Sequence, residues 1–415
     1  MRTRKPSLGA IFLTVFLDLV GFGLVLPFLA DEARDSFGTT AFTATLLSAV
    51  YSLMQFLFVP VWGRLSDRVG RRPVLVWSVG ATAMSMAALG LALAYGHSIL
   101  WLFAARTFSG IATANLGTAS AYIADITKPE ERAKGMGLIG MAFGLGFILG
   151  PAMGGVLAGV AVHGRHGPLA CWAAAALSVV NFAWVSIGLP ESLPPERRAA
   201  PGASKRSLMP MNLAAARAAF QLPGVASAVL VNFLIILSFT NLDQTFRFFT
   251  KDLFGMSPVG TGLLLAFIGV VGAGVQGGVI RPLAKRFDEA WLIRTGVLLQ
   301  AVAFAGLAAS PSVGKELLFA SGALLAVGNG LTQPSVSAFI SRRADATSQG
   351  GTLGTNQSVA SLARVFGPAF GGWVYGAIGP RSPYVAASLG MVVALAFALR
   401  LQRSPRAGAV VRQEA

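Results

Sequence analysis

Long apolar stretches separated by short polar segments rich in glycine and proline dominate the 415-residue chain. Crossing a hydrocarbon core of about 30 Å takes roughly 20 apolar residues in a helix. Twelve stretches meet that length, and each is predicted to be a membrane-spanning helix. The expected spans are 8–30, 42–62, 74–95, 98–123, 135–161, 168–189, 223–250, 258–281, 290–310, 315–340, 351–377 and 381–402.

Two short sequences recur at a spacing of 217 residues, which points to an internal repeat. Residues 150–155 (GPAMGG) return as 367–372 (GPAFGG), and 120–123 (SAYI) return as 337–340 (SAFI). Chance similarity is the alternative, because small residues are common in membrane helices. The shared offset favours an all-α membrane protein of two pseudo-symmetric six-helix halves, the plan of transporters with a site at the bilayer midplane. The expected domains are 1–189, a cytoplasmic central loop at 190–222, and 223–415.

Composition and charge agree with a membrane protein. Only 12% of the residues are charged, against about 25% in soluble domains. Counting charges near a span end with the adjacent loop, 25 of the 33 Lys and Arg residues lie on the side of the two termini, five lie on the opposite side, and Arg106, Arg247 and Arg364 are counted within spans. This bias predicts cytoplasmic termini and accounts for the net charge of +16 without a nucleic-acid partner. Short loops and the richness in Ala, Gly and Arg suggest a bacterial inner membrane.

Cysteine and histidine are too scarce for most metal chemistry. The single cysteine, Cys171, excludes an intramolecular disulfide and any cysteine cluster, and three histidines give little basis for a metal site. No phosphate-binding loop for ATP is present, and we expect no cofactor.

A charged residue at the bilayer centre costs about 2.5–3.5 kcal/mol on insertion scales. Of the charged residues within the predicted spans, the candidates for a functional role are Asp18, Arg106, Asp243, Arg247 and Arg364; the others lie within five residues of a span end. Asp18 lies near the middle of the first span, and a carboxyl there can be neutralised by a proton at modest cost. We therefore expect Asp18 to carry protons with Arg106 as its counter-charge; the alternative is a structural carboxylate paired permanently with an arginine.

Polar residues in the second half are candidates for substrate contacts. Asp243 and Arg247 are four residues apart and can pair on one helix face, and Asn329 and Gln333 share the same spacing. Buried amides also serve as hydrogen-bonding links between helices, so that structural interpretation stays open. The candidate substrate-binding set is Asn241, Asp243, Arg247, Asn329, Gln333, Gln357 and Arg364.

The segment between the second and third spans reads GRLSDRVGRRP, from Gly63 to Pro73. Its glycines permit a tight turn, and Asp67 can cap a helix or pair with a guanidinium. The spacing resembles the signature loop G-x-L-x-D-R-x-G-R-[RK] of the major facilitator superfamily. The resemblance implies a role in conformational gating for Gly63, Asp67, Arg68, Gly70, Arg71 and Arg72.

Two further motifs carry the same resemblance. Leu102, Arg106 and Gly110 resemble the fourth-span motif of the family. The arginine of that motif is associated with proton transfer. The fifth span is similar to the motif associated with drug/proton antiporters, which implies gating roles for Gly146, Gly150, Pro151, Gly154 and Gly155.

Within the superfamily the chain resembles the tetracycline/proton antiporters at 14–30, 51–75 and 144–155. Those antiporters typically carry an acidic residue within the third span, and 74–95 has none. The resemblance therefore supports drug efflux as a class more strongly than tetracycline as the drug.

These features predict a monomeric, proton-driven transporter and not an enzyme. The expected function is export of amphipathic drugs or toxic metabolites in exchange for protons by alternating access, with small-molecule substrate, protons and membrane lipids as partners. One alternative is a metabolite, lipid or sugar carrier of the same fold, proton-coupled or passive. Another is a non-transporting sensor or assembly factor.

Overall fold

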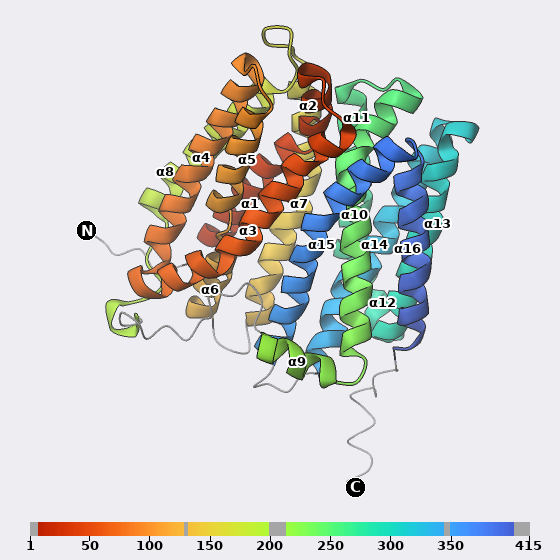
Figure 1. The fold of residues 1–415 in the computed structure, drawn as a ribbon. Helices are drawn as coiled ribbons and strands as arrows, with labels where there is room; N and C mark the ends of the chain where they lie inside the picture. Colours follow the sequence, from red (N-terminus) through yellow and green to blue (C-terminus); the bar gives the residue numbers. More distant parts are fainter. Residues whose placement is uncertain (1–6, 128–131, 199–212, 344–348, 402–415) are drawn as a thin grey trace. The chain divides into compact units, whose positions relative to one another are not determined.

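The computed structural model describes residues 7–127, 132–198, 213–343 and 349–401, which are almost entirely helical and form no strand (Figure 1). The helices of the first half are α1 (Leu8–Val25), α2 (Leu29–Phe37), α3 (Ala41–Val69), α4 (Arg71–Tyr95), α5 (Leu100–Ala112), α6 (Leu116–Ile126), α7 (Arg132–Ala158) and α8 (Pro168–Gly188). A short 3-10 turn (Pro195–Arg197) and α9 (Leu213–Gln221) follow. The second half has α10 (Val225–Phe254), α11 (Pro258–Gly274), a π-helical turn (Val275–Val279), α12 (Ile280–Arg286), α13 (Glu289–Val313), α14 (Lys315–Arg343), α15 (Gln349–Ala377) and α16 (Ser382–Leu399).

The helix boundaries repeat between the halves at the spacing found in the sequence. Helix α10 covers the residues 217 positions beyond α1 and α2 together, and α11 to α12 cover those 217 positions beyond α3. Helices α7 and α15 begin 217 positions apart as well. The predicted two-half helical plan is thus seen in the helix boundaries themselves.

Local sequence explains where several helices begin. Ser7 accepts a hydrogen bond from the Ala10 backbone amide at 3.2 Å, and Asp288 accepts one from Trp291 at 3.0 Å. Such N-caps satisfy amides that have no partner inside the helix. Gly70 separates α3 from α4 with φ of +109°, a conformation that side-chain-bearing residues adopt at a cost.

Eight helical segments are long and apolar enough to cross a membrane by length and composition among the described residues. The other four predicted spans coincide with α5 to α6, α7, α14 and α15, which carry more polar and glycine residues. Together with the repeat, this helical organisation is that of an integral membrane protein.

Four details differ from the expected spans. The first predicted span, 8–30, is interrupted by a turn at 26–28 between α1 and α2. The helix α3 runs on to Val69, so most of the motif segment is helical and the turn is confined to Gly70. The predicted fourth span is broken between α5 and α6, and the eighth is interrupted by the π-helical turn and continues to Arg286. Hydropathy detects apolar length, whereas the break between α5 and α6 involves hydrogen bonds from side chains of neighbouring helices and the end of α3 a local bond from Gly70 to Ser66.

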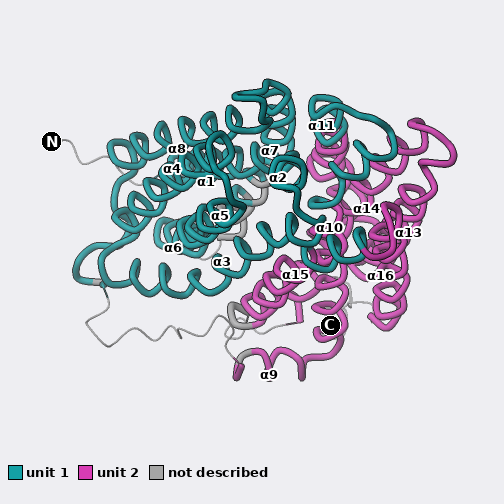
Figure 2. The backbone as a smooth tube through the Cα atoms, turned by 45° about the horizontal axis from the view of Figure 1, so that its top comes forward, with its two compact units in different colours: residues 1–210, 243–266, 368–376 teal, residues 211–242, 267–367, 377–415 magenta. Residues whose placement is uncertain are grey.

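The chain forms two compact units, each coloured separately in Figure 2. Unit 1 comprises residues 1–210, 243–266 and 368–376, and unit 2 comprises 211–242, 267–367 and 377–415. Unit 1 thus contains α1 to α8 together with one end of α10, most of α11 and the last turns of α15.

Candidate transport site

A hydrogen-bonded group inside unit 1 holds the Asp18 carboxylate. Asn115 Nδ2 donates to Asp18 Oδ2 at 3.1 Å and to Ser78 Oγ at 2.6 Å. Asn115 and Ser78 are buried, and Asp18 Oδ1 is inaccessible and has no hydrogen-bond partner among the described residues. The polar group nearest to this carboxylate is therefore a neutral amide.

Asn115 occupies its position because the helix is interrupted there. Residues 113–115 form a turn between α5 and α6, which frees backbone carbonyls inside the bundle. Side chains of α3 and α4 satisfy three consecutive carbonyls: Trp62 donates to Ile111 O at 2.7 Å, Ser78 to Ala112 O at 2.6 Å and Gln55 to Thr113 O at 3.2 Å. Interrupted helices at membrane depth are tolerated when protein groups complete their hydrogen bonds, and they are typical of transporter sites.

Arg106 lies on α5, the helix that ends at this break. Its side chain is 1% exposed, and its guanidinium carbon lies 4.3 Å from the centre of the Tyr51 ring. The Tyr51 hydroxyl lies 2.8 Å from Thr113 Oγ1, which connects this aromatic contact to the turn. Arg106 Nε and Nη1 have no hydrogen-bond partner, and no ion pair with Arg106 occurs among the described residues.

The expected pairing of Asp18 with Arg106 is wrong in this structure. Asp18 contacts Asn115, and Arg106 contacts the Tyr51 ring. A cation over an aromatic face is attracted to the ring by about 0.5–2 kcal/mol. The Tyr51 ring therefore supplies part of the stabilisation that an ion pair would give to the buried Arg106 cation. Tyr51, Ser78 and Thr113 were not singled out from the sequence, where single hydroxyls in apolar helices resemble ordinary packing residues.

The expected pairing of Asp243 with Arg247 is also wrong. Arg247 Nε lies 3.2 Å from Asp31 Oδ2, and Arg247 Nη1 donates to Met256 O at 2.7 Å and to Thr261 Oγ1 at 3.2 Å. Asp243 is half-buried and has no ion pair or hydrogen bond among the described residues. Tertiary contact with α2 supplies Arg247 with a closer acid than its own helix does.

The substrate candidates of unit 2 lie on three helices. Asn241 on α10 donates to Pro383 O at 2.9 Å, which makes its amide a link to α16. Asn329 and Gln333 lie one turn apart on α14, and Gln357 and Arg364 lie on α15. Asn232 donates to Asn356 Oδ1 at 3.0 Å, a further contact between α10 and α15.

The signature segment forms a charged cluster at the α3–α4 turn. Arg71 Nη1 lies 2.6 Å from Asp67 Oδ1, one of the two expected roles for Asp67, and Arg71 Nε lies 3.0 Å from Asp125 Oδ2. Glu191 accepts hydrogen bonds from the backbone amides of Arg71 at 2.8 Å and Arg72 at 3.2 Å. A carboxylate at a helix N-terminus is stabilised by the helix dipole.

Glu191 and Asp125 were missed from the sequence. The only available signal was their occurrence in polar segments on the same predicted side as the signature loop. The structure also places Gly63 inside α3, leaves Arg68 exposed, and lets Arg72 Nη2 donate to Ser186 O at 2.5 Å.

The small residues of α7 pack this helix against α1. A Cβ at Gly150 would lie 2.6 Å from the Gly23 Cα, and one at Gly146 would lie 2.8 Å from the Leu19 Cβ. Gly154 and the helix-internal Pro151 are buried in the same stripe, whereas the buried Gly155 faces Gly262 of α11. Close backbone approach of this kind needs glycine, as the motif resemblance implies.

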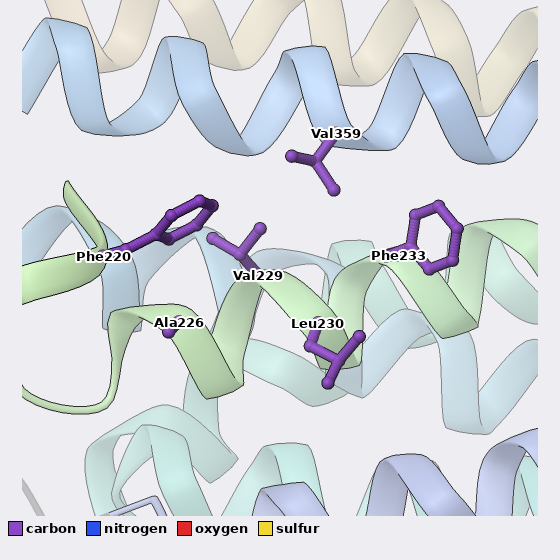
Figure 3. Close-up of a pocket in the computed structure, with 6 residues that line it drawn as sticks. All are labelled: Phe220, Ala226, Val229, Leu230, Phe233 and Val359. Atoms are coloured by element: carbon purple, nitrogen blue, oxygen red, sulfur yellow. The ribbon is translucent and has the colours of Figure 1, made fainter. Parts of the chain in front are cut away.

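Unit 2 also contains an apolar groove of about 350 Å³ beside α9, α10 and α15 (Figure 3). Its lining comprises Phe220, Ala226, Val229, Leu230, Phe233 and Val359. In Figure 3 Val359 points from α15 towards the α10 side chains. A groove with this lining can accept a hydrocarbon or aromatic group but offers no hydrogen bond from its side chains.

Comparisons with known proteins agree with the helical plan. The family described as the Major Facilitator Superfamily matches residues 11–315 and 277–415. The tetracycline resistance protein of class C from Escherichia coli is 36% identical over 86% of this chain and 86% of its own length. Major facilitator superfamily domain-containing protein 10 from Bos taurus is 31% identical over 91% of this chain and 88% of its own length.

A solved structure shows the same architecture. The crystal structure of the human organic anion transporter MFSD10 (TETRAN) matches with a TM-score of 0.70 and 26% identity, covering 94% of this chain and 98% of that one.

Proposed function

The chain belongs to the Major Facilitator Superfamily, and we propose that it exports amphipathic drugs or toxic metabolites in exchange for protons. It is a transporter of a small molecule and not an enzyme. Its place in a bacterial inner membrane, its cytoplasmic termini, its monomeric state and its independence of cofactors are parts of the same proposal.

The observation that carries the proposal is the Asp18 carboxyl, which is bound by a neutral amide and not by a cation. Asn115 can hydrogen-bond both the charged and the protonated Asp18 carboxyl. Its side-chain NH2 group donates to a carboxyl oxygen, and its side-chain oxygen can accept from a protonated carboxyl. An ion pair with Arg106 would instead hold the carboxyl in its charged form. Asp18 can therefore gain and lose a proton without dismantling the polar group around it.

Arg106 supplies the second element of the coupling scheme. It is a fully buried cation whose Nε and Nη1 have no hydrogen-bond partner. Neutralising Asp18 changes the balance of charge in a bundle that holds this cation, and so changes the relative free energy of two conformations. Inward proton movement supplies about 2.3 kcal/mol per 100 mV of membrane potential to that cycle.

The apolar groove supports an amphipathic substrate. Amphipathic compounds need an apolar surface for one part and polar groups for the other, and the groove lined by Phe220, Phe233 and Val359 provides the first. The tetracycline resistance relatives support an antibiotic among the substrates.

Transport of an organic anion is the second candidate function. The unsatisfied guanidinium nitrogens of Arg106 favour it, because a carboxylate, phosphate or sulfonate is their natural partner. The similarity to the human organic anion transporter MFSD10 points the same way. A substrate of this class would bind near Arg106 in a conformation in which the Arg106 side chain is accessible.

The test uses inside-out membrane vesicles acidified by respiration and containing a pH-sensitive dye. Cationic, neutral and anionic amphiphiles are added to wild type, Asp18→Asn and Asp288→Asn; Asp288 caps α13 and belongs neither to the coupling scheme nor to the substrate-binding candidates. We expect compound-dependent proton release in wild type and Asp288→Asn and its loss in Asp18→Asn. Release that survives in Asp18→Asn contradicts the role of Asp18, and release with anions alone selects the second candidate.

A further inference from the structure

The 217-residue repeat extends to the charged side chains at the ends of α2 and α10. Arg34-Asp35 near the end of α2 corresponds to Lys251-Asp252 near the end of α10, 217 residues further along the chain. Both copies place a cation directly before an aspartate. All four residues belong to unit 1, shown in one colour in Figure 2.

The two copies pair with each other reciprocally. Arg34 Nη1 and Nη2 donate to Asp252 Oδ2 and Oδ1, both at 2.8 Å, in a bidentate ion pair. Lys251 is paired with Asp35. The cation of each copy therefore binds the aspartate of the other, which is the pattern of a self-complementary contact about a two-fold axis.

Neighbouring groups complete the cluster and balance its charge. Asp31 Oδ2 lies 3.2 Å from Arg247 Nε, and Asp31 Oδ1 lies 3.4 Å from Lys251 Nζ. Tyr375 of α15 donates a hydrogen bond to Asp252 Oδ2 at 2.8 Å. Three carboxylates thus face three cations, and removal or reversal of one charge leaves a partly buried partner unpaired.

Backbone contacts around the cluster repeat in the same way. Gly155 of α7 packs on Gly262 of α11, where a Cβ would lie 2.8 Å from the opposite Cα. The positions 217 residues away from these two are Gly372 of α15 and Thr45 of α3, and these two also pack on each other. The ionic pairs therefore belong to a larger contact in unit 1 that occurs twice.

We propose that Arg34, Asp35, Lys251 and Asp252 form a reciprocal clasp that holds this end of the transporter closed and must open in each transport cycle. The inference rests on the alternating access of the proposed function. Separation of α2 from the end of α10 breaks both ion pairs together, because each helix contributes to both. The clasp consequently favours a closed or an open end over intermediate positions.

Exchanging the two charged residues within a dipeptide gives a test in which the amino-acid composition of the protein does not change. Reversing one copy, with Arg34→Asp and Asp35→Arg, places like charges opposite each other in both pairs. Reversing the other copy, with Lys251→Asp and Asp252→Lys, does the same. Reversing both copies restores opposite charges in the two reciprocal pairs, while Asp31 loses its contact with Lys251. All these proteins have the same net charge.

The readout is the reactivity of a reporter cysteine. Cys171, the only native cysteine, is replaced by Ser, and Ser48→Cys is introduced where Ser48 Oγ donates to Gln244 Oε1 at 2.6 Å between α3 and α10. Reaction with a polar maleimide is followed on purified protein in nanodiscs without substrate or gradient. Failure of the proposed drug export would therefore leave this measurement interpretable.

Each single-copy reversal is expected to raise the labelling rate by about tenfold, a shift typical of coupling between conformational states. The double reversal should lower the rate well below that of either single-copy reversal, because the two reciprocal pairs are restored together. Recovery should stop short of the parent rate, because Asp31 loses its contact with Lys251. Arg342→Glu, which breaks the ion pair between the exposed Arg342 and Glu289 in unit 2, should leave the rate unchanged.

Unchanged labelling in both single-copy reversals overturns the clasp, as does a double reversal that labels as fast as the single ones. Lower thermal stability without faster labelling also overturns it, since the cluster would then only stabilise the fold. If the single-copy reversals do not accumulate as folded protein, Tyr375→Phe removes one hydrogen bond to Asp252 and is expected to raise the rate by about twofold. No increase in that variant overturns the proposal equally.

Discussion

At the scale of single residues, Asn115 is expected to control how Asp18 takes part in coupling. Asn115→Ala removes the donor to both Asp18 and Ser78 and leaves buried polar atoms unsatisfied, at a cost of about 1–3 kcal/mol. We expect proton-driven export to fall by about tenfold, on the basis that about 1.4 kcal/mol corresponds to that factor. The measurement is substrate efflux from proteoliposomes under an imposed pH gradient.

Asn181→Ala is the matched control, because Asn181 is also buried and donates to Thr14 O on α1 at 3.0 Å without contacting Asp18. It should lower thermal stability to a similar degree and keep the response to the pH gradient. Equal loss of coupling in both variants would show that Asn115 acts only through stability.

The sequence identified Asp18 and Arg106 because each is a charge inside a long apolar stretch. It did not identify their partners. Asn115 reaches Asp18 only because the helix is interrupted at 113–115, and Arg106 has an aromatic partner from α3. Both facts depend on tertiary packing, which the spacing of residues along one helix does not encode.

At the scale of elements, the α3–α4 turn depends on Gly70. A side chain at its φ of +109° costs about 1–2 kcal/mol. A Cβ there would also displace the Glu191 carboxylate that accepts the first amides of α4. Gly70→Ala is therefore expected to lower the free energy of unfolding by about 2 kcal/mol or more, measured by thermal or chemical unfolding in detergent.

Gly354→Ala in α15 supplies the comparison, because no atom lies within 4 Å of the added Cβ and the backbone is helical. That substitution should leave stability unchanged or raise it by about 0.5–1 kcal/mol. Similar destabilisation by the two substitutions would contradict the specific role of the turn.

The helical elements were largely predictable and their interruptions were not. Apolar length placed α4, α8 and α13 within a few residues, since burial in lipid requires continuous hydrophobic helices. The end of α3, the break before α6 and the π-helical turn depend on side chains from other helices or on local backbone hydrogen bonds. A hydropathy profile contains no information about these contacts.

At the scale of the whole molecule, the reciprocal clasp predicts that a covalent link can stop the cycle. Arg34→Cys with Asp252→Cys, in the Cys171→Ser background, replaces the ion pair by two thiols that a short bis-methanethiosulfonate reagent can bridge. Cross-linking should abolish export and reduction of the link should restore it, as measured on the same proteoliposomes before and after treatment. Full export by the cross-linked protein would show that α2 and the end of α10 do not separate during transport.

The two-fold repeat was visible in the sequence from two short motifs, and the structure extends it to most helix boundaries. The clasp was not foreseen, although both dipeptides are plain in the sequence. Arg34, Lys251 and their neighbouring aspartates lie in segments predicted as loops outside the spans. Only the contacts of the folded chain show that each copy binds the other.

The central claim is that protonation of Asp18 drives transport, and it is tested most directly by separating exchange from uphill movement. Purified wild type and Asp18→Asn are reconstituted in liposomes with a compound that elicits proton release in vesicles. Asp18→Asn should still exchange labelled for unlabelled compound without a gradient, yet fail to accumulate it when a pH gradient is imposed. Accumulation by Asp18→Asn equal to that of wild type would contradict the account.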